Sequence, residues 1–427
     1  MIKKNLLSAC CTLAITLLMM SGQALAQNNT SPYSMLGIGD LEKSSFDRTS
    51  GMGHAGLALS SSRFIYQANP ASYAALDQHF LFFEAASRFR NVSYTGAPIT
   101  DLSSNVTNDL QFKKVNLGTK VTPRWAVGFG LNPYSTVNYS FAGVKAIQGS
   151  NLFADAYYTG TGSSSIGHIT NSFVVNKNLS VGLQTAYLFG HMEETETLSG
   201  SIADSLITTT RNRNIGQARF KLGFQYKNSL NKLWDIALGG TYSPQANLWS
   251  NTSIKARSGL TTLLESENYK SSYFTLPVTY QAGIAATFRK SFTLALDYQY
   301  EGWRRTNVSG ISYILDDSRR FSGGFEYSKK SSYLDQVFEK YFLQTGVFYT
   351  DSYLRINGIQ LKDYGLTLGA GAELGRTPLS SLAIQAALEL GVRGTTNKGL
   401  IRESYTQFTL SLCYRDFWVS RKMKRYE

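Results

Sequence analysis

The chain has 427 residues and a formal net charge of +13, and aromatic residues make up 13% of it. Besides Cys10 and Cys11 near the N-terminus, Cys413 is the only cysteine, which excludes a disulfide framework. Beyond the first 26 residues the chain contains no run of about 20 apolar residues, so the sequence predicts no membrane-spanning helix there.

Residues 1–26 have the pattern of a signal peptide. Two lysines, Lys3 and Lys4, precede an apolar stretch that begins at Leu6. Small residues at Ala24-Leu25-Ala26 then suit cleavage by signal peptidase. We therefore expect the mature chain to be exported, and we expect no nucleic-acid partner.

Residues 27–78 are predicted to form a small N-terminal plug. Its glycines allow tight backbone bends where side chains would not fit. Asn69 is a favourable N-cap and Pro70 suits the first helical position, so residues 71–76 are predicted to form a short helical segment. The residues that we assign to the plug or gate are Gly51, Gly53, Gly56, Asn69, Pro70 and Ala71.

The same glycines spell G-x-G-x-x-G, which is also typical of dinucleotide-binding loops. That motif requires a strand before it and a helix after it within a βαβ unit. The residues before Gly51 are polar and turn-like, and no βαβ alternation follows. We therefore expect no bound nucleotide and no other cofactor.

Residues 79–419 predict a barrel of fourteen amphipathic strands, an even number that suits outer-membrane barrels. The predicted strands are residues 80–92, 110–121, 125–139, 166–175, 179–194, 213–226, 234–248, 273–288, 292–303, 320–327, 341–350, 364–374, 382–392 and 404–419. The predicted fold is therefore all-β, a 14-stranded antiparallel transmembrane β-barrel with a small N-terminal plug.

The side chains alternate along these strands. In the last strand, Phe408, Leu410 and Leu412 share one face, whereas Thr409 and Ser411 share the other. A charge that faces lipid costs several kcal/mol near the midplane, so the polar faces are predicted to line the lumen. The predicted lumen-lining residues are Asp297, Gln299, Glu301, Gln385, Glu389, Arg393 and Arg415. A soluble β-sandwich is the alternative, although its outer faces seldom carry so many aromatic residues.

The connections between the strands predict an orientation. Short turns such as residues 176–178 alternate with long polar connections such as residues 142–165 and 250–272. Short turns face the periplasm in bacterial outer-membrane barrels, so we expect both termini there, with residues 420–427 as a basic tail. Membrane lipid and lipopolysaccharide phosphates are the expected partners of basic residues near the membrane surface.

The third predicted strand is interrupted at Asn132-Pro133, near the expected middle of the membrane. Proline cannot donate to the ladder, so the strand is predicted to kink or detach there and to border a lateral opening covered by the plug. A plain bulge without a passage is the alternative. Pro277 is expected early in its strand, where a proline needs no special role.

Neither a metal site nor an enzymatic activity is predicted. The four histidines lack H-x-x-x-H spacing, and no motif places a nucleophile beside a base. Asp297, Glu301 and Glu389 are interpreted as lumen residues balanced by Arg393 and Arg415, in preference to paired catalytic carboxylates.

The order of these parts resembles the FadL family of outer-membrane transporters for hydrophobic compounds. The shared features are an export signal, a glycine-rich segment that ends in Asn69-Pro70-Ala71, and the strand alternation. More specific motifs resemble the branch of that family found in bacteria with type IX secretion, which includes PorV-related barrels. These motifs are Ser31-Pro32-Tyr33, Gly37-Ile38-Gly39-Asp40, Gly394-Thr395-Thr396-Asn397 and Leu400-Ile401-Arg402-Glu403.

The resemblance implies passive, plug-gated uptake of a small hydrophobic molecule, either fatty acid-like or aromatic, with lateral release into the membrane. PorV-related barrels serve protein secretion instead. The alternative is therefore a non-transporting subunit that docks other outer-membrane proteins in a secretion or assembly complex. The long connections of this chain are mostly polar, unlike the hydrophobic loops of fatty-acid transporters.

Overall fold

The computed structural model describes residues 31–96, 105–146, 151, 153–199, 206–266, 269–306, 313–333, 336–377 and 380–418. The predicted signal peptide and the predicted basic tail lie outside these residues. Within the described part, no helix is long and apolar enough to cross a membrane.

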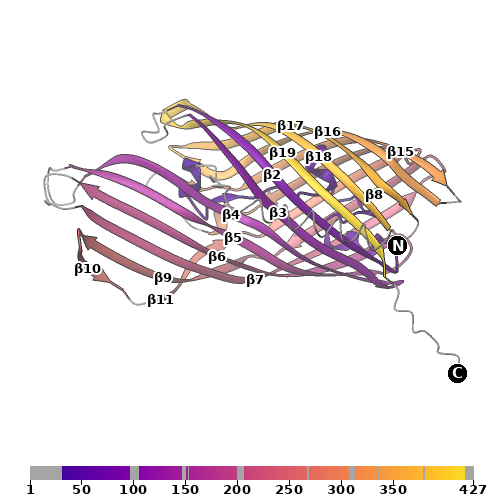
Figure 1. Cartoon of the computed structure of the whole chain (residues 1–427), viewed down its shortest axis with the longest axis horizontal. Coiled ribbons are helices and arrows are strands. Elements are labelled where there is room, and N and C mark those ends of the chain that lie inside the picture. The colour runs from indigo at the N-terminus through magenta and orange to yellow at the C-terminus, as the bar shows by residue number, and fades with distance from the viewer. Residues whose placement is uncertain are drawn as a thin grey trace, which may run out of the picture.

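The described residues form one closed antiparallel barrel (Figure 1). Its strands are β2 (Phe80–Gly96), β3 (Val106–Thr122), β4 (Trp125–Ala146), β5 (Phe153–Val174), β6 (Leu179–Ser199), β7 (Ile207–Ser229), β8 (Trp234–Ser243), β9 (Ala246–Ser258), β10 (Thr261–Glu265), β11 (Tyr269–Leu276), β12 (Thr279–Phe288), β13 (Phe292–Glu301), β14 (Tyr313–Leu315), β15 (Ser318–Tyr333), β16 (Gln336–Ile356), β17 (Ile359–Thr377), β18 (Ser380–Gly394) and β19 (Ile401–Phe417). The last strand closes the barrel by pairing with the first wall strand, from Phe417 opposite Phe80 to Ile401 opposite Gly96.

The barrel wall has fourteen strands, as the sequence predicts. The structure describes nineteen strands in total. Of these, β1 (Asp40–Leu41) lies in the N-terminal segment and β10 forms a hairpin with β9. The pairs β8 and β9, β11 and β12, and β14 and β15 are successive halves of single wall strands, because each pair shares a neighbouring strand or strand pair.

The alternation of side chains confirms the predicted faces. On β19, Phe408, Leu410 and Leu412 are exposed on the outside, whereas Thr409 and Ser411 are buried. An apolar outer surface around a polar interior is the pattern of a membrane barrel. It excludes the soluble sandwich, in which the apolar faces would be buried between two sheets.

Several strands are longer than the sequence predicts. Most of residues 142–165 and 250–272, which are predicted as loops, belong to strands, and β7 reaches 23 residues. A membrane crossing needs only about 9–11 residues. The ladders continue beyond the apolar band, where alternation of polar residues gives no signal, and β5, β6, β7 and β9 project furthest (Figure 1).

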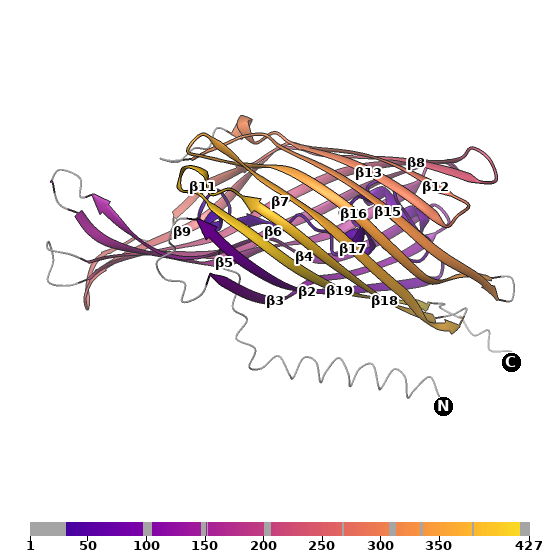
Figure 2. The same ribbon diagram turned by 90° about the horizontal axis from the view of Figure 1, so that it is seen from above.

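Residues 31–78, which we call the inner segment, lie within the barrel (Figures 1 and 2). They contain β1 and three short 3-10 helices, η2 (Pro32–Met35), η3 (Arg48–Met52) and η4 (Pro70–Ala75). The side chain of Asn69 accepts a hydrogen bond from the Ala71 amide and so caps η4, as the sequence predicts. Two further 3-10 helices, η5 (Trp303–Thr306) and η6 (Asn397–Gly399), lie between strands of the wall.

The wall makes room for the inner segment through glycines that face the lumen. At each of them, an added Cβ would lie 3.0 Å or less from an atom of the inner segment. We call these residues the glycine belt. They are Gly118, Gly128, Gly182, Gly223, Gly239, Gly283, Gly324, Gly346 and Gly369. The backbone of the inner segment packs directly on the wall at Gly182, Gly239, Gly324, Gly346 and Gly369, and its side chains pack on the wall at the other four glycines.

Candidate functional site

The wall has a discontinuity between β3 and β4. Their ladder runs from Thr122 opposite Trp125 to Val115 opposite Leu131 and ends there. The next residue pair of β4, Asn132-Pro133, is the predicted break, and the β4–β5 register shifts directly after Pro133. Beyond this point β4 continues to pair with β5 but not with β3.

The inner segment binds β4 where β3 leaves it. Asp40 and Leu41 of β1 pair with Thr136 and Ser135 of β4 in antiparallel register. Two more backbone hydrogen bonds extend this contact, from the Glu42 amide to the Tyr134 carbonyl (2.9 Å) and from the Ser31 amide to the Asn138 carbonyl (2.9 Å). The gap in the wall is therefore occupied by a strand of the inner segment, which satisfies backbone groups that lipid could not satisfy.

The side chain of Asn132 also contacts the inner segment, through His168. The Asn132 Nδ2 atom lies 3.3 Å from His168 Nε2, and the Nε2 atom of Gln67 lies 3.0 Å from the same nitrogen. Gln67 in turn accepts a hydrogen bond from Asn116 of β3. Side chains of β3, β4 and β5 thus converge on one residue of the inner segment beside the break.

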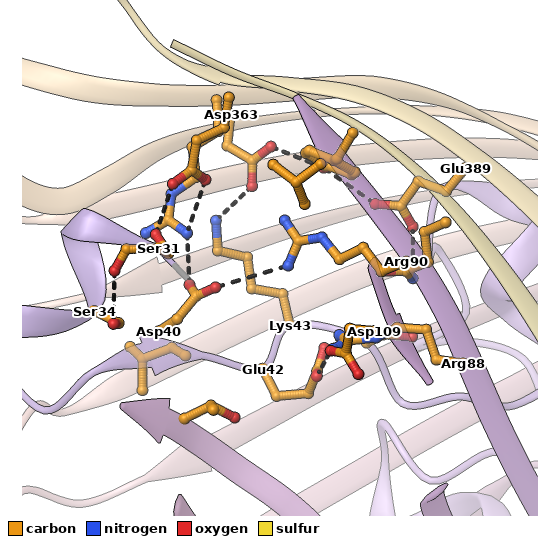
Figure 3. Close-up of a pocket in the computed structure, with 18 of the residues that line it drawn as sticks. Ser31, Ser34, Asp40, Glu42, Lys43, Arg88, Arg90, Asp109, Asp363 and Glu389 are labelled. Atoms are coloured by element: carbon orange, nitrogen blue, oxygen red, sulfur yellow. Dashed lines mark hydrogen bonds and ion pairs between the residues drawn. The ribbon is translucent and has the colours of Figure 1, made fainter. Parts of the chain in front are cut away.

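A charged cavity of about 80 Å³ lies inside the lumen next to this gap (Figure 3). Asp40, Glu42 and Lys43 of the inner segment face wall residues from several strands. The ion pairs that line the cavity are Asp40–Arg393 (2.6 Å), Asp40–Arg90 (3.7 Å), Glu42–Arg88 (3.0 Å), Glu42–Lys113 (3.1 Å) and Lys43–Asp363 (2.8 Å). Each joins the inner segment to the wall.

These ion pairs keep the carboxyls of the inner segment ionised in spite of their burial. Burial raises the pKa of the Glu42 carboxyl, but the charges of Lys113 and Arg88 lower it to about 2 overall. Burial likewise opposes ionisation of Asp40, yet Arg393 and Arg90 hold its pKa below the usual value. The β1 end of the inner segment is therefore attached electrostatically as well as by backbone pairing.

A second charged contact holds η3. Arg48 is buried and donates from Nε and Nη2 to both carboxylate oxygens of Glu326, at 2.9 and 2.8 Å. It also pairs with Glu339, and its guanidinium lies 4.0 Å from the ring centre of Phe342. Bidentate arginine–carboxylate pairs of this kind fix geometry as well as charge.

The residues that we assigned to the plug all contact the wall or cap a turn. Gly51 lies against Gly369, and Pro70 and Ala71 lie against the glycine belt at Gly182. The remaining contacts are the Gly53 amide to Thr367 Oγ1 (2.7 Å), the Gly56 amide to Asp297 Oδ2 (2.7 Å) and Asn69 Nδ2 to the carbonyls of Leu57 (3.0 Å) and Phe224 (2.9 Å). Their role in gating stays a prediction.

The predicted lumen-lining residues face several separate parts of the lumen. Their contacts are Asp297 with the Gly56 and Leu57 amides, Gln299 with Glu301, Gln385 with Cys413, Glu389 with His54, Arg393 with Asp40, and Arg415 with Asp77. The interpretation that Arg393 and Arg415 balance the three carboxylates is wrong, because both arginines pair with acids of the inner segment.

A serine and a histidine do meet in the structure, although no sequence motif brings them together. Ser44 Oγ lies 3.2 Å from His54 Nδ1, and His54 Nε2 lies 2.9 Å from Glu389 Oε2. The order serine, histidine, acid is that of a hydrolytic triad. The Ser44 Oγ atom also accepts a hydrogen bond from the Phe46 amide at 3.1 Å. We interpret the contacts from Ser44 through His54 to Glu389 as an attachment of the inner segment to the wall. No group of three or more possible metal ligands occurs among the residues that the structure describes.

Comparison with known proteins identifies the family. A family model described as BamG matches residues 1–425. The chain belongs to the BamG family. No curated protein matches it.

Solved structures with the same fold include a FadL homologue and two proteins described as toluene transporters. A Pseudomonas aeruginosa FadL homologue is 14% identical, with a TM-score of 0.60 over 89% of this chain and 100% of that one. The Pseudomonas putida toluene transporter TodX is 16% identical (TM-score 0.57, 89% and 99% covered), and the Ralstonia pickettii toluene transporter TbuX is 15% identical (TM-score 0.57, 87% and 97% covered). This member of the BamG family therefore has the FadL-like barrel that the sequence resembles. The narrower branch with type IX secretion stays a prediction.

Proposed function

We propose that this protein is an outer-membrane channel that takes up a small hydrophobic molecule, with the inner segment as its plug and the β3–β4 gap as its lateral exit. The observation that carries the proposal is the pairing of β1 with β4 where β3 leaves the ladder. A strand of only two residues closes the wall there. Similar barrels described as toluene transporters support the ligand class.

An apolar cluster in the half of the lumen near the long connections supports an entry route for such a molecule. Its buried side chains come from the wall and from the inner segment. They include Tyr33, Ile38, Leu188, Met192, Ile215, Leu248, Phe274, Trp303 and Tyr353. On β6 and β7, Leu188 and Ile215 of this cluster lie further along the strands from the short turns than Gln184 and Lys221 of the polar cavity. A ligand that enters from the end with the long connections would therefore meet the cluster before the polar cavity.

The two lumen cavities beside the β3–β4 gap are small. The charged cavity measures about 80 Å³ and a second, polar cavity about 190 Å³. Sites for drug-sized ligands measure about 300–1,000 Å³. Passage of a ligand through the gap therefore requires displacement of β1. This displacement breaks the two residue pairs between β1 and β4 and the ion pairs of Asp40 and Glu42.

A disulfide between β1 and β4 tests this route. Leu41 and Ser135 are register partners, so cysteines at both positions can lock β1 onto β4. Oxidation should stop the uptake of radiolabelled toluene by whole cells, and reduction should restore it. A matched control joins Leu366 to Leu390, which are partners in the continuous β17–β18 ladder. Equal uptake with the two cross-links would contradict lateral release.

The second candidate function is a docking subunit for other outer-membrane proteins, and the exposed tip of the wall favours it. Beyond the membrane band, the hairpin of β9 and β10 carries Leu260, Leu263 and Leu264 with exposed fractions of 104%, 57% and 53%. Three exposed leucines on a projecting hairpin are typical of a protein contact. Replacing Leu260 and Leu263 by aspartate should release a co-purifying protein in this case and leave toluene uptake unchanged.

A further inference from the structure

Two prolines on neighbouring wall strands interrupt the wall at the same level. Pro244 separates β8 from β9, and Pro277 separates β11 from β12. Ser243 pairs with Thr279 on one side of the breaks, and Ala246 pairs with Leu276 on the other, so the two breaks lie side by side. The expectation that Pro277 lies inside one continuous strand is therefore wrong. Prolines lack the amide that a central ladder requires.

β7, the wall strand next to β8 and β9, also has a stretch that does not pair with either of them. β7 pairs with β9 up to Gly216 and with β8 from Leu222 onward, and residues 217–221 pair with neither. Arg219 and Lys221 lie in this stretch, two residues apart, so they share a face. Both line the polar cavity of about 190 Å³, together with Asn132 and Pro133 on the far side.

The two basic side chains have no acidic partner among the described residues. Arg219 donates to two neutral hydroxyls, Tyr134 Oη at 3.2 Å and Thr279 Oγ1 at 3.4 Å. Lys221 makes no hydrogen bond or ion pair with any described residue, and the like charge of Arg219 acts on it. Both side chains are half-buried. Removing cations from water without a partner is costly, so proteins pair such cations or use them to bind anions.

The carboxylates of this cavity do not neutralise the pair. Glu42 lines the cavity, but it is engaged by Lys113 and Arg88. Glu301 accepts hydrogen bonds from Gln299 (2.8 Å) and from the Trp303 indole (2.7 Å). Both carboxylates therefore have other partners, and neither forms an ion pair with Arg219 or Lys221 within the described residues.

We propose that the polar cavity is an oxyanion site, in which Lys221 and Arg219 bind a phosphate group. An arginine and a lysine that converge on one cavity suit this chemistry, because the guanidinium offers paired donors and the ammonium offers a point charge. The polar lining residues Ser243, Thr279 and His168 surround the same space. The phosphate is either a free ion or the head of an amphiphile, and this site goes beyond the proposed uptake of an uncharged hydrophobic molecule.

Titration calorimetry on the purified full chain in a neutral detergent tests the site. Inorganic phosphate and dodecyl phosphate are the two probes, at low ionic strength. Lys221→Met and Arg219→Gln should each weaken binding about ten-fold or more, as expected for the loss of a charge-assisted hydrogen bond. Lys232→Met changes an exposed lysine in a turn and should leave binding unchanged. Tighter binding of dodecyl phosphate than of phosphate would assign the site to an amphiphile, and equal binding would assign it to a free ion.

Thermal unfolding gives a second readout that does not depend on calorimetry. Without phosphate, Lys221→Met should unfold at a higher temperature than the wild type, because it removes a half-buried charge that has no partner among the described residues. Phosphate should raise the unfolding temperature of the wild type but not of this variant. The proposal is overturned if neither probe binds the wild type, or if Lys221→Met binds both as the wild type does. Neither result depends on whether the barrel takes up toluene.

Discussion

Asn69 holds three parts of the structure with one side chain. Its Oδ1 caps η4, and its Nδ2 donates to the carbonyls of Leu57 and Phe224, so it joins two turns of the inner segment to β7. Asn69→Ala removes the cap and leaves two carbonyls without this donor. We expect a loss of roughly 3 kcal/mol in unfolding free energy, measured by urea titration in lipid vesicles.

The control for this variant is Asn176→Ala. Asn176 also accepts two backbone hydrogen bonds, from the amides of Asn178 and Leu179, but it lies in an exposed turn. Water can replace a lost hydrogen bond there, so we expect a loss below about 1 kcal/mol. Equal losses in the two variants would show that Asn69 contributes only a local turn.

Glu42 links the attachment of β1 to pH. Its pKa in the folded protein is about 2, compared with an ordinary value of 4.5. A lowered pKa means that the contribution of Glu42 is fully present above about pH 4.5 and is lost as the pH falls through 2. The shift corresponds to stability on the order of 3 kcal/mol. Glu42→Gln should therefore be less stable than the wild type at pH 7, and this difference should shrink toward zero near pH 2.

Acid titration of unfolding with both proteins measures this difference, and limited proteolysis of the inner segment gives the same comparison. Glu265→Gln is the control, because Glu265 pairs with Lys255 at the exposed tip of the barrel. A stability difference between Glu42→Gln and the wild type that is constant from pH 7 to pH 2 would contradict the ionic attachment of β1.

Residues of the site could be predicted from the sequence where the residues that interact lie close together along the chain. Asn69 caps an amide two residues away, and Pro133 breaks its own strand, so both signals are local. Arg48 pairs with Glu326, which lies 278 residues further on, and no local pattern reports that contact. Glu389 was predicted to line the lumen, but its contact with His54, and that of His54 with Ser44, were missed for the same reason.

The glycine belt leaves space on the inner face of the wall for the inner segment. At Gly223, an added Cβ would lie 2.3 Å from Asn69 Oδ1 and 2.8 Å from Pro70 Cδ. Gly223→Val should therefore displace η4 from the wall, while the strands still pair. We expect faster proteolysis of the inner segment, with the gel mobility of the folded barrel preserved.

Gly143→Val is the matched control for the glycine belt. Gly143 also lies on a wall strand, but its added Cβ would meet only Tyr158, at 3.8 Å. This contact is ordinary van der Waals packing, so proteolysis of the inner segment should match the wild type. If Gly143→Val loosened the inner segment as much as Gly223→Val, the effect would belong to strand propensity, not to the glycine belt.

The wall strands were predictable to the extent that they contact lipid. Within the membrane band, apolar and polar residues alternate, and the predicted number and order of strands are confirmed. Outside that band the ladders continue through polar residues such as Thr195 and Thr197, whose alternation carries no burial signal. The breaks at Pro244 and Pro277 were missed because each proline lies inside an otherwise regular apolar alternation.

At the scale of the whole molecule, the barrel is closed by its own N-terminal segment. β4 exchanges its neighbour β3 for β1, and the glycine belt contacts the rest of the segment from strands around the wall, from β3 to β17. The same residues that occupy the lumen therefore complete the wall. Under the proposed function, movement of the inner segment away from β4 would leave β4 without its neighbour beyond Leu131, so plug movement and lateral opening would be coupled.

The two unlike ends of the barrel predict its orientation in the membrane. One end has short turns, such as residues 123–124 between β3 and β4, and the other carries the projecting strands β5, β6, β7 and β9. Outer-membrane barrels place short turns in the periplasm.

A membrane-impermeant maleimide should therefore label Leu260→Cys on intact cells but not Lys177→Cys, which lies in an exposed short turn. Both should react after lysis, whereas the buried Cys413 should stay unlabelled. Labelling of Lys177→Cys alone on intact cells would reverse the orientation and place the apolar cluster on the periplasmic side.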